Sequence, residues 1–109
     1  MLQLNREFSR EEVQDLVRMF CDEGSLLLGR MGTAIEQDDN ETLSRAAHAL
    51  RGAGANFGAQ ILNSLCQQIE AFAQARDFIR ATTLLMQVRD EFERIQTALQ
   101  TECDSPYNE

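Results

Sequence analysis

The amino-acid sequence predicts an all-α protein, an antiparallel four-helix bundle whose helices run up, down, up and down. Apolar residues recur every three to four positions in four separate segments, which is the spacing of one helix face. Short polar breaks separate these segments, and helices joined by short connections pack as antiparallel neighbours. No run alternates as a strand would. We expect residues 1–109 to form one domain, with the bundle over about 9–101.

The first helix should begin directly after Ser9. Ser9 and Glu12 have the spacing of a capping box, in which each side chain accepts a hydrogen bond from the other residue's amide. Three glycines weaken this helix, so it could kink or break near Gly24. Residues 1–8 should be an irregular lead-in. The positions expected to face inward are Val13, Leu16, Val17, Phe20, Leu27, Leu28, Met31 and Ile35.

Two shorter helices should follow. Residues 38–40 form a polar break rich in N-cap residue types, which predicts a second helix over about 41–55. Residues 56–58 close that helix, and a third should run over about 59–74. The positions expected to face inward are Leu43, Ala46, Ala47, Leu50 and Gly54 in the second helix and Ile61, Leu62, Leu65, Ile69 and Phe72 in the third.

A turn at residues 75–77 leads into the fourth helix, expected over about 78–101. The tail, residues 102–109, contains the single proline and should be loose. The positions expected to face inward in this helix are Ala81, Leu84, Leu85, Val88, Phe92, Ile95 and Leu99.

Composition excludes several classes of function. A net charge of −8 and an isoelectric point of about 4.6 argue against nucleic-acid binding and against an anionic membrane surface. No apolar run approaches the roughly 20 residues of a membrane span. Cys21, Cys66 and Cys103 are odd in number and far apart, so they match neither a disulfide framework nor a metal site. The first residues lack an apolar signal core, so we expect a cytoplasmic protein.

The most informative stretch is 46–58, which holds the only histidine. On a helix, His48 shares a face with Ser44, Arg51 and Gly52 and points away from the apolar stripe. Glycine inside a helix costs about 1 kcal/mol relative to alanine. Two glycines within three residues, Gly52 and Gly54, therefore indicate close approach by another backbone or molecule.

An outward imidazole beside a cation is suited to nucleophilic chemistry. Neutral imidazole is a good nucleophile near neutral pH, and Arg51 can pair with an anion formed on the ring of His48. A metal site is disfavoured because there is no second histidine. A hydrolytic triad is disfavoured because only Ser44 lies nearby and no oxyanion loop follows. No glycine-rich loop follows a strand, so no nucleotide site is indicated. A lone exposed histidine without any chemical role stays an alternative.

Together these residues resemble the histidine-containing phosphotransfer (HPt) domains of multistep phosphorelays, over nearly the whole chain. The family pattern reads Ala-His-x-Leu-Lys-Gly, then a spacer ending in Gly, Leu-x-x-Leu-Cys and a Leu-Glu-like pair. The matching residues are Ala47-His48-Ala49-Leu50-Arg51-Gly52, Phe57-Gly58-Ala59, Leu62, Leu65-Cys66 and Ile69-Glu70.

The resemblance assigns a role to each site residue. His48 is the phospho-acceptor, and Arg51 stands where the family usually has lysine and is the charge partner of the phosphoryl group. Gly52 clears room for the partner. Glu70 lies where some members have a glutamine that bonds the imidazole. It could accept from Nδ1–H and leave Nε2 free to attack, although its charge would repel a phosphoryl group.

The implied function is that of a phosphorelay intermediate, which takes a phosphoryl group from a receiver-domain phospho-aspartate and passes it to another receiver aspartate. We expect response-regulator receivers and a hybrid sensor histidine kinase as partners, and no enzyme activity, nucleotide site, metal or cofactor of its own. Mg²⁺ would come with the receiver. The domain would be cytoplasmic, free or at the cytoplasmic end of a membrane-bound kinase. The alternatives are a phosphate-independent helical interaction module and a chemotaxis-kinase-type phospho-accepting domain.

Overall fold

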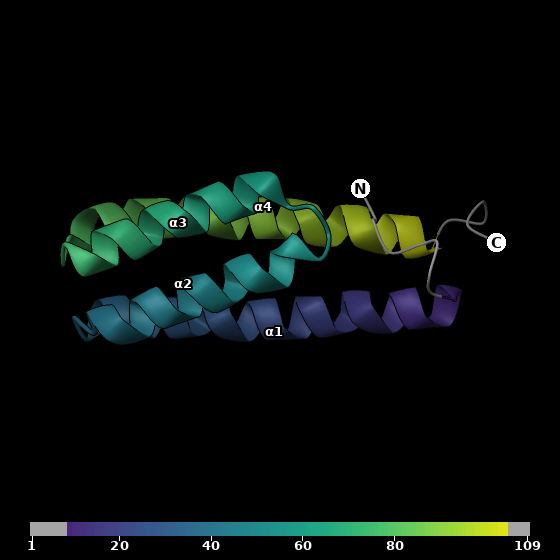
Figure 1. The fold of residues 1–109 in the computed structure, drawn as a ribbon, viewed down its shortest axis with the longest axis horizontal. Helices are drawn as coiled ribbons and strands as arrows, with labels where there is room; N and C mark the ends of the chain where they lie inside the picture. Colours follow the sequence, from purple (N-terminus) through teal and green to yellow (C-terminus); the bar gives the residue numbers. More distant parts are fainter. Residues whose placement is uncertain (1–8, 105–109) are drawn as a thin grey trace.

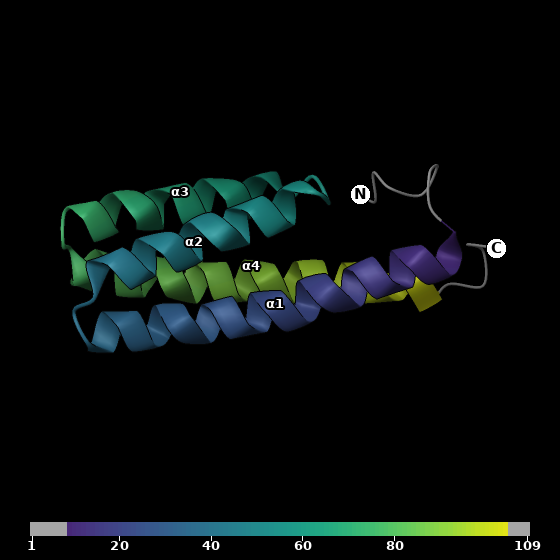
Figure 2. The ribbon, with the colours of Figure 1, turned by 60° about the horizontal axis from the view of Figure 1, so that its bottom comes forward.

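The computed structural model describes residues 9–104, with side chains over 9–101, as an antiparallel four-helix bundle. Each helix packs against its neighbours in chain order, and the fourth closes the bundle against the first (Figures 1 and 2). The up-down-up-down arrangement is therefore confirmed. The helices are α1 (Arg10–Glu36), α2 (Asn40–Ala55), α3 (Gln60–Gln74) and α4 (Phe78–Asp104).

The bundle has two long helices and two short ones. α1 and α4 each contain 27 residues, whereas α2 contains 16 and α3 contains 15. At about 1.5 Å per residue, the long helices each span roughly 40 Å. The start of α1 and the end of α4 consequently extend past the α2–α3 connection (Figure 1). No helix of the part described is long and apolar enough to cross a membrane.

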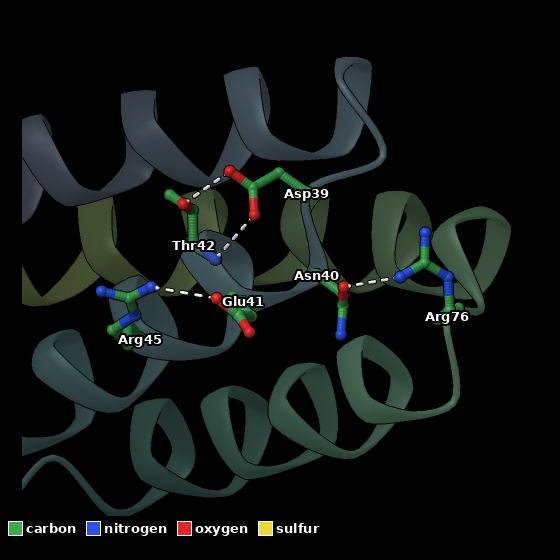
Figure 3. A network of polar contacts seen from close by, with 6 residues as sticks. All are labelled: Asp39, Asn40, Glu41, Thr42, Arg45 and Arg76. Atoms are coloured by element: carbon green, nitrogen blue, oxygen red, sulfur yellow. Dashed lines mark hydrogen bonds and ion pairs between the residues drawn. The ribbon is translucent and has the colours of Figure 1, made fainter.

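Capping contacts confirm the predicted starts of α1 and α2. The Ser9 hydroxyl accepts from the Glu12 amide at 3.1 Å, and the Glu12 carboxylate accepts from the Ser9 amide at the same distance. At the start of α2, the Asp39 carboxylate accepts from the hydroxyl and the amide of Thr42 at 2.7 and 3.1 Å (Figure 3). These two hydrogen bonds lower the pKa of the Asp39 carboxyl. α1 continues past Gly24 as one helix, so the break considered from the sequence is absent.

A side-chain contact ties the α3–α4 connection to the start of α2 at one end of the bundle. Arg76, between α3 and α4, has a positive φ of 56°, and Asp38, between α1 and α2, has one of 53°. Such left-handed turns need support in residues other than glycine. The Arg76 guanidinium donates to the Asn40 side-chain oxygen at 2.7 Å (Figure 3). This contact joins the α3–α4 turn to the first residue of α2.

All the inward positions predicted for α2 and α4 are buried. An aromatic cluster fills the middle of the core, where the Phe20 ring lies 5.1 Å from that of Phe57 and 5.2 Å from that of Phe92. Gly24 makes room for this cluster, because a Cβ atom there would lie 2.2 Å from Cε1 of Phe92. Gly24, expected from the sequence to weaken α1, is therefore required for this packing.

The predicted face of α3 needs correction. Ile61 is 58% exposed, and Leu65 and Phe72 are only partly buried. The buried line is Leu62, Cys66, Ile69 and Ala73, which keeps the helical spacing of three and four residues. The prediction followed large apolar side chains, and it was wrong because the centre of this face also contains a cysteine and an alanine. Leu16 and Ile35 of α1 are likewise partly buried at the edge of the core.

The end of the last helix also differs from the prediction. α4 continues to Asp104, so residues 102–104 are helical and not part of a loose tail. Residues 101–104 include neither glycine nor proline, so nothing local stops the helix at 101. The expectations for residues 1–8 and 105–109 lie outside the described part of the chain.

Candidate functional site

His48 lies on the outer face of α2, as predicted. Leu43, Ala47 and Leu50 are fully buried on the opposite face, whereas 67% of the His48 side chain is exposed. Helical geometry produces this division, because the buried residues follow a spacing of three and four that position 48 does not share. The imidazole therefore does not serve the hydrophobic core.

Two charged side chains contact the ring at the same nitrogen. Arg51, one turn further along α2, places Nη2 3.0 Å from Nδ1 of His48. Glu70 reaches across from α3 and places Oε1 3.3 Å from the same atom. Among the described residues Nε2 has no partner. The ring is consequently held at one nitrogen and open at the other.

The Glu70 carboxylate is the least exposed group of this cluster, with 19% of its side chain exposed. Its Oε2 atom is buried and has no hydrogen bond in the described part of the chain. The Arg51 Nε atom lies 3.5 Å from it, which is within ion-pair distance. A buried carboxylate without a nearby cation would be costly, so Arg51 offsets the burial of Glu70 while it also contacts His48.

Gly52 opens the surface beside the ring. A Cβ atom built at Gly52 meets nothing within 4 Å. The position borders a hollow between α2 and the start of α3, which His48 and Arg51 also line. Gln60 and Asn63 of α3 form the opposite side of this hollow. Sequence reasoning missed these two amides, because only the packing of α3 against α2 brings them opposite the histidine.

Gly54, the second glycine of the motif, has a different purpose. Its added Cβ atom would lie 3.0 Å from Cδ2 of Leu62 and 3.4 Å from Cβ of Ala59. Gly54 is buried and lets α3 approach α2 closely. The close approach inferred from the two glycines is thus a helix contact at Gly54 and open space at Gly52.

Cys66 lies one turn before Glu70 in the buried line of α3. Burial, with a smaller contribution from the negative charge of Glu70, raises the pKa of the Cys66 thiol to about 12. The thiol therefore stays protonated at neutral pH, where it is a poor nucleophile and metal ligand. Across the described residues, no group of three histidine, cysteine, aspartate or glutamate side chains could hold a metal ion.

Sequence comparison relates this chain to known proteins over most of its length. The family model described as the Hpt domain matches residues 15–101. Histidine-containing phosphotransfer protein 2 of Oryza sativa subsp. japonica is 29% identical over 91 residues, which cover 82% of this chain and 61% of that protein. Histidine-containing phosphotransfer protein 5 of Arabidopsis thaliana is 25% identical over 100 residues, covering 89% of this chain and 64% of that protein.

A solved structure shows the same architecture. The crystal structure of histidine-containing phosphotransfer protein B (HptB) from Pseudomonas aeruginosa PAO1 matches with a TM-score of 0.77 and 26% sequence identity. The match covers 81% of this chain and 76% of that one. By contrast, the chain spans less than two thirds of the length of the two plant relatives.

Proposed function

This chain belongs to the Hpt domain family, and we propose that it is a phosphorelay intermediate. His48 accepts a phosphoryl group from the phospho-aspartate of a receiver domain and passes it to the aspartate of another receiver. The observation that carries the proposal is the imidazole itself, which is two-thirds exposed, held at Nδ1 and open at Nε2. It lies within the family motif and inside the matched region.

The reaction needs an unprotonated Nε2. In the tautomer with the proton on Nδ1, the Nε2 lone pair attacks phosphorus in line with the bond to the aspartyl oxygen. The N–P bond forms, the P–O bond breaks, and its electron pair goes to the aspartate carboxylate. Glu70 supports this tautomer, because its Oε1 is placed to accept from Nδ1–H. The phosphorylated ring then carries positive charge at Nδ1, beside the carboxylate.

Arg51 and Gly52 act on the incoming group. A guanidinium presents a fork of donors that matches phosphoryl oxygens, so Arg51 is placed to hold the group beside the ring. Gly52 leaves the space in which the partner must approach. We infer that the chain is a carrier without a kinase or nucleotide site and needs no cofactor of its own. The receiver would supply Mg²⁺ and most of the transition-state stabilisation.

The charge on the two short helices suits an anionic partner site. The chain has a net charge of −8, but α2 and α3 contain two acidic and two basic residues. These form two pairs, Glu41 with Arg45 at 3.4 Å and Glu70 with Arg51 at 3.5 Å. A face without net charge repels a phospho-aspartate less than the acidic remainder of the molecule does. We therefore place receiver docking over α2 and α3.

The upstream donor in this proposal is a receiver, such as that of a hybrid sensor kinase, acting in the cytoplasm where ATP charges the relay. The test presents the purified chain with phosphorylated receiver domains, with an ATP-bound histidine kinase and with phosphoramidate, a small donor. Acid-labile, base-stable phosphate delivered by a receiver, and removable by a second receiver, is the expected result.

Two other outcomes would overturn the proposal in different ways. Phosphate arriving only from the ATP-bound kinase would assign the chain to the chemotaxis-kinase type of domain. No phosphate from any donor would leave a helical interaction module whose histidine has no phosphotransfer role.

A further inference from the structure

Two side chains compete for one nitrogen of His48. A guanidinium can only donate a hydrogen bond, so the Arg51 contact at 3.0 Å requires a lone pair on Nδ1. An ionised carboxylate can only accept, so the Glu70 contact at 3.3 Å requires a proton on Nδ1. A neutral imidazole carries its proton on one nitrogen at a time. The two contacts therefore demand opposite tautomers.

The two tautomers differ in their ability to react. When Nδ1 accepts from Arg51, the proton resides on Nε2, and the exposed nitrogen has no lone pair for attack on phosphorus. When Nδ1 donates to Glu70, the lone pair is on Nε2. The shorter contact in the structure is that of Arg51, which corresponds to the unreactive form.

We propose that Arg51 is a tautomer gate for His48. In the resting domain it holds Nδ1 and keeps Nε2 protonated. When a phosphoryl group arrives, the guanidinium turns to the phosphoryl oxygens, because hydrogen bonds between charged groups are stronger than one to a neutral ring. Nδ1 is then free for Glu70. One proton moves from Nε2 to Nδ1 through water, the ring stays neutral, and Nε2 gains its lone pair.

The surroundings of Arg51 permit this movement. Its side chain is 26% exposed and lines the same hollow as Gly52, where a Cβ atom would meet nothing. Its second contact, between Nε and Glu70 Oε2, is an ion pair of 3.5 Å and not a hydrogen bond. A guanidinium can hold this pair through one nitrogen while another reaches His48, which the single ammonium of a lysine could not reproduce.

The purpose of the gate rests on the proposed function, but the tautomer of His48 can be measured without any phosphate transfer. The chain has one histidine, so ¹⁵N-histidine labelling gives one pair of ring nitrogens, whose chemical shifts distinguish protonated from unprotonated nitrogen. In mildly alkaline buffer, where imidazole is neutral, we expect the Nε2–H tautomer to dominate in the wild type.

Two variants should move the ratio of the Nδ1–H tautomer to the Nε2–H tautomer in opposite directions. Arg51→Ala should shift it toward Nδ1–H by at least about tenfold, the factor expected when a hydrogen bond to a charged group is lost. Glu70→Ala should shift it further toward Nε2–H. Arg51→Lys keeps the charge without the fork, and it serves as the second variant if Arg51→Ala does not fold. We expect Arg51→Lys to lie between the wild type and Arg51→Ala.

An unchanged ratio in both Arg51 variants, or a wild type already dominated by Nδ1–H, would overturn the gate. Neither result would contradict the phosphorelay proposal, because neither measures phosphate transfer. Conversely, a chain that accepts no phosphate but shows the expected tautomer shifts would refute the relay and leave the competition between Arg51 and Glu70 standing.

Discussion

Gly24 in α1 and Gly52 in α2 both stand inside helices, where glycine costs about 1 kcal/mol relative to alanine. At Gly24 an added Cβ atom would lie 2.2 Å from the Phe92 ring, whereas at Gly52 it would meet nothing within 4 Å. The first glycine lets an aromatic ring reach the backbone of α1. The second leaves the surface beside His48 open.

The comparison separates the molecule into two regions. The long helices α1 and α4 supply Phe20 and Phe92 to the aromatic cluster and provide the tight glycine contact. The short helices α2 and α3 present His48, Arg51 and Glu70 at the surface. Changes to the buried side chains of the first region should lower stability, whereas changes at the exposed positions His48 and Gly52 should alter phosphate transfer with little loss of stability.

The largest expected effect is that of Phe92→Ala, which should lower the free energy of unfolding by about 3–5 kcal/mol. The ring is 3% exposed and packs against Phe20 and Gly24. Urea unfolding followed by circular dichroism measures the change. A midpoint close to that of the wild type would show that the Phe92 ring is not an essential part of the core.

Gly24→Ala should cost about 1–3 kcal/mol, because overpacking against a buried ring outweighs the better helix propensity of alanine. Gly29→Ala is the matched control, since it lies in the same helix with nothing within 4 Å of its added Cβ atom. The control should be neutral or stabilising by up to about 1 kcal/mol. Equal unfolding midpoints for the two variants would show that the contact with Phe92 does not distinguish Gly24 from Gly29.

Gly52→Gln should slow transfer from a receiver at least about tenfold, a barrier increase of about 1.4 kcal/mol. Its melting temperature should be equal to or above that of the wild type, because the position is open and glutamine favours helix. Phosphoramidate needs no docking and should be affected less. Gly29→Gln makes the same change at another open position and should transfer normally. Unchanged receiver transfer in Gly52→Gln would move the docking face away from this glycine.

Rules that relate residues a few positions apart predicted many features of this structure. The capping box at Ser9, the break before α2 and the outward direction of His48 each depend on residues three or four positions apart, and the structure confirms all three. Sequence spacing alone fixes such relations. The placement of Arg51 and Gly52 on the same outer face as His48 was predictable for the same reason.

Those rules do not predict contacts between different helices. The approach of Glu70 to His48 joins residues 22 positions apart, and only family resemblance indicated it. The ring that explains Gly24 belongs to Phe92, on another helix. Ile61 was placed inward by its apolar side chain, although it lies on the exposed side of α3. Each case depends on the rotation of one helix against another, which the hydrophobic period of a single helix does not specify.

His48→Gln most directly tests the division between the buried core and the outer face of α2 that presents His48. The free energy of unfolding and the uptake of phosphate are both measured on one preparation of this variant. An exposed substitution should change stability by no more than about 0.5 kcal/mol, since 67% of this side chain is exposed. The variant should then melt like the wild type and take up no acid-labile phosphate from a receiver or from phosphoramidate. A large loss of stability, or phosphate still bound to the variant, would contradict the account.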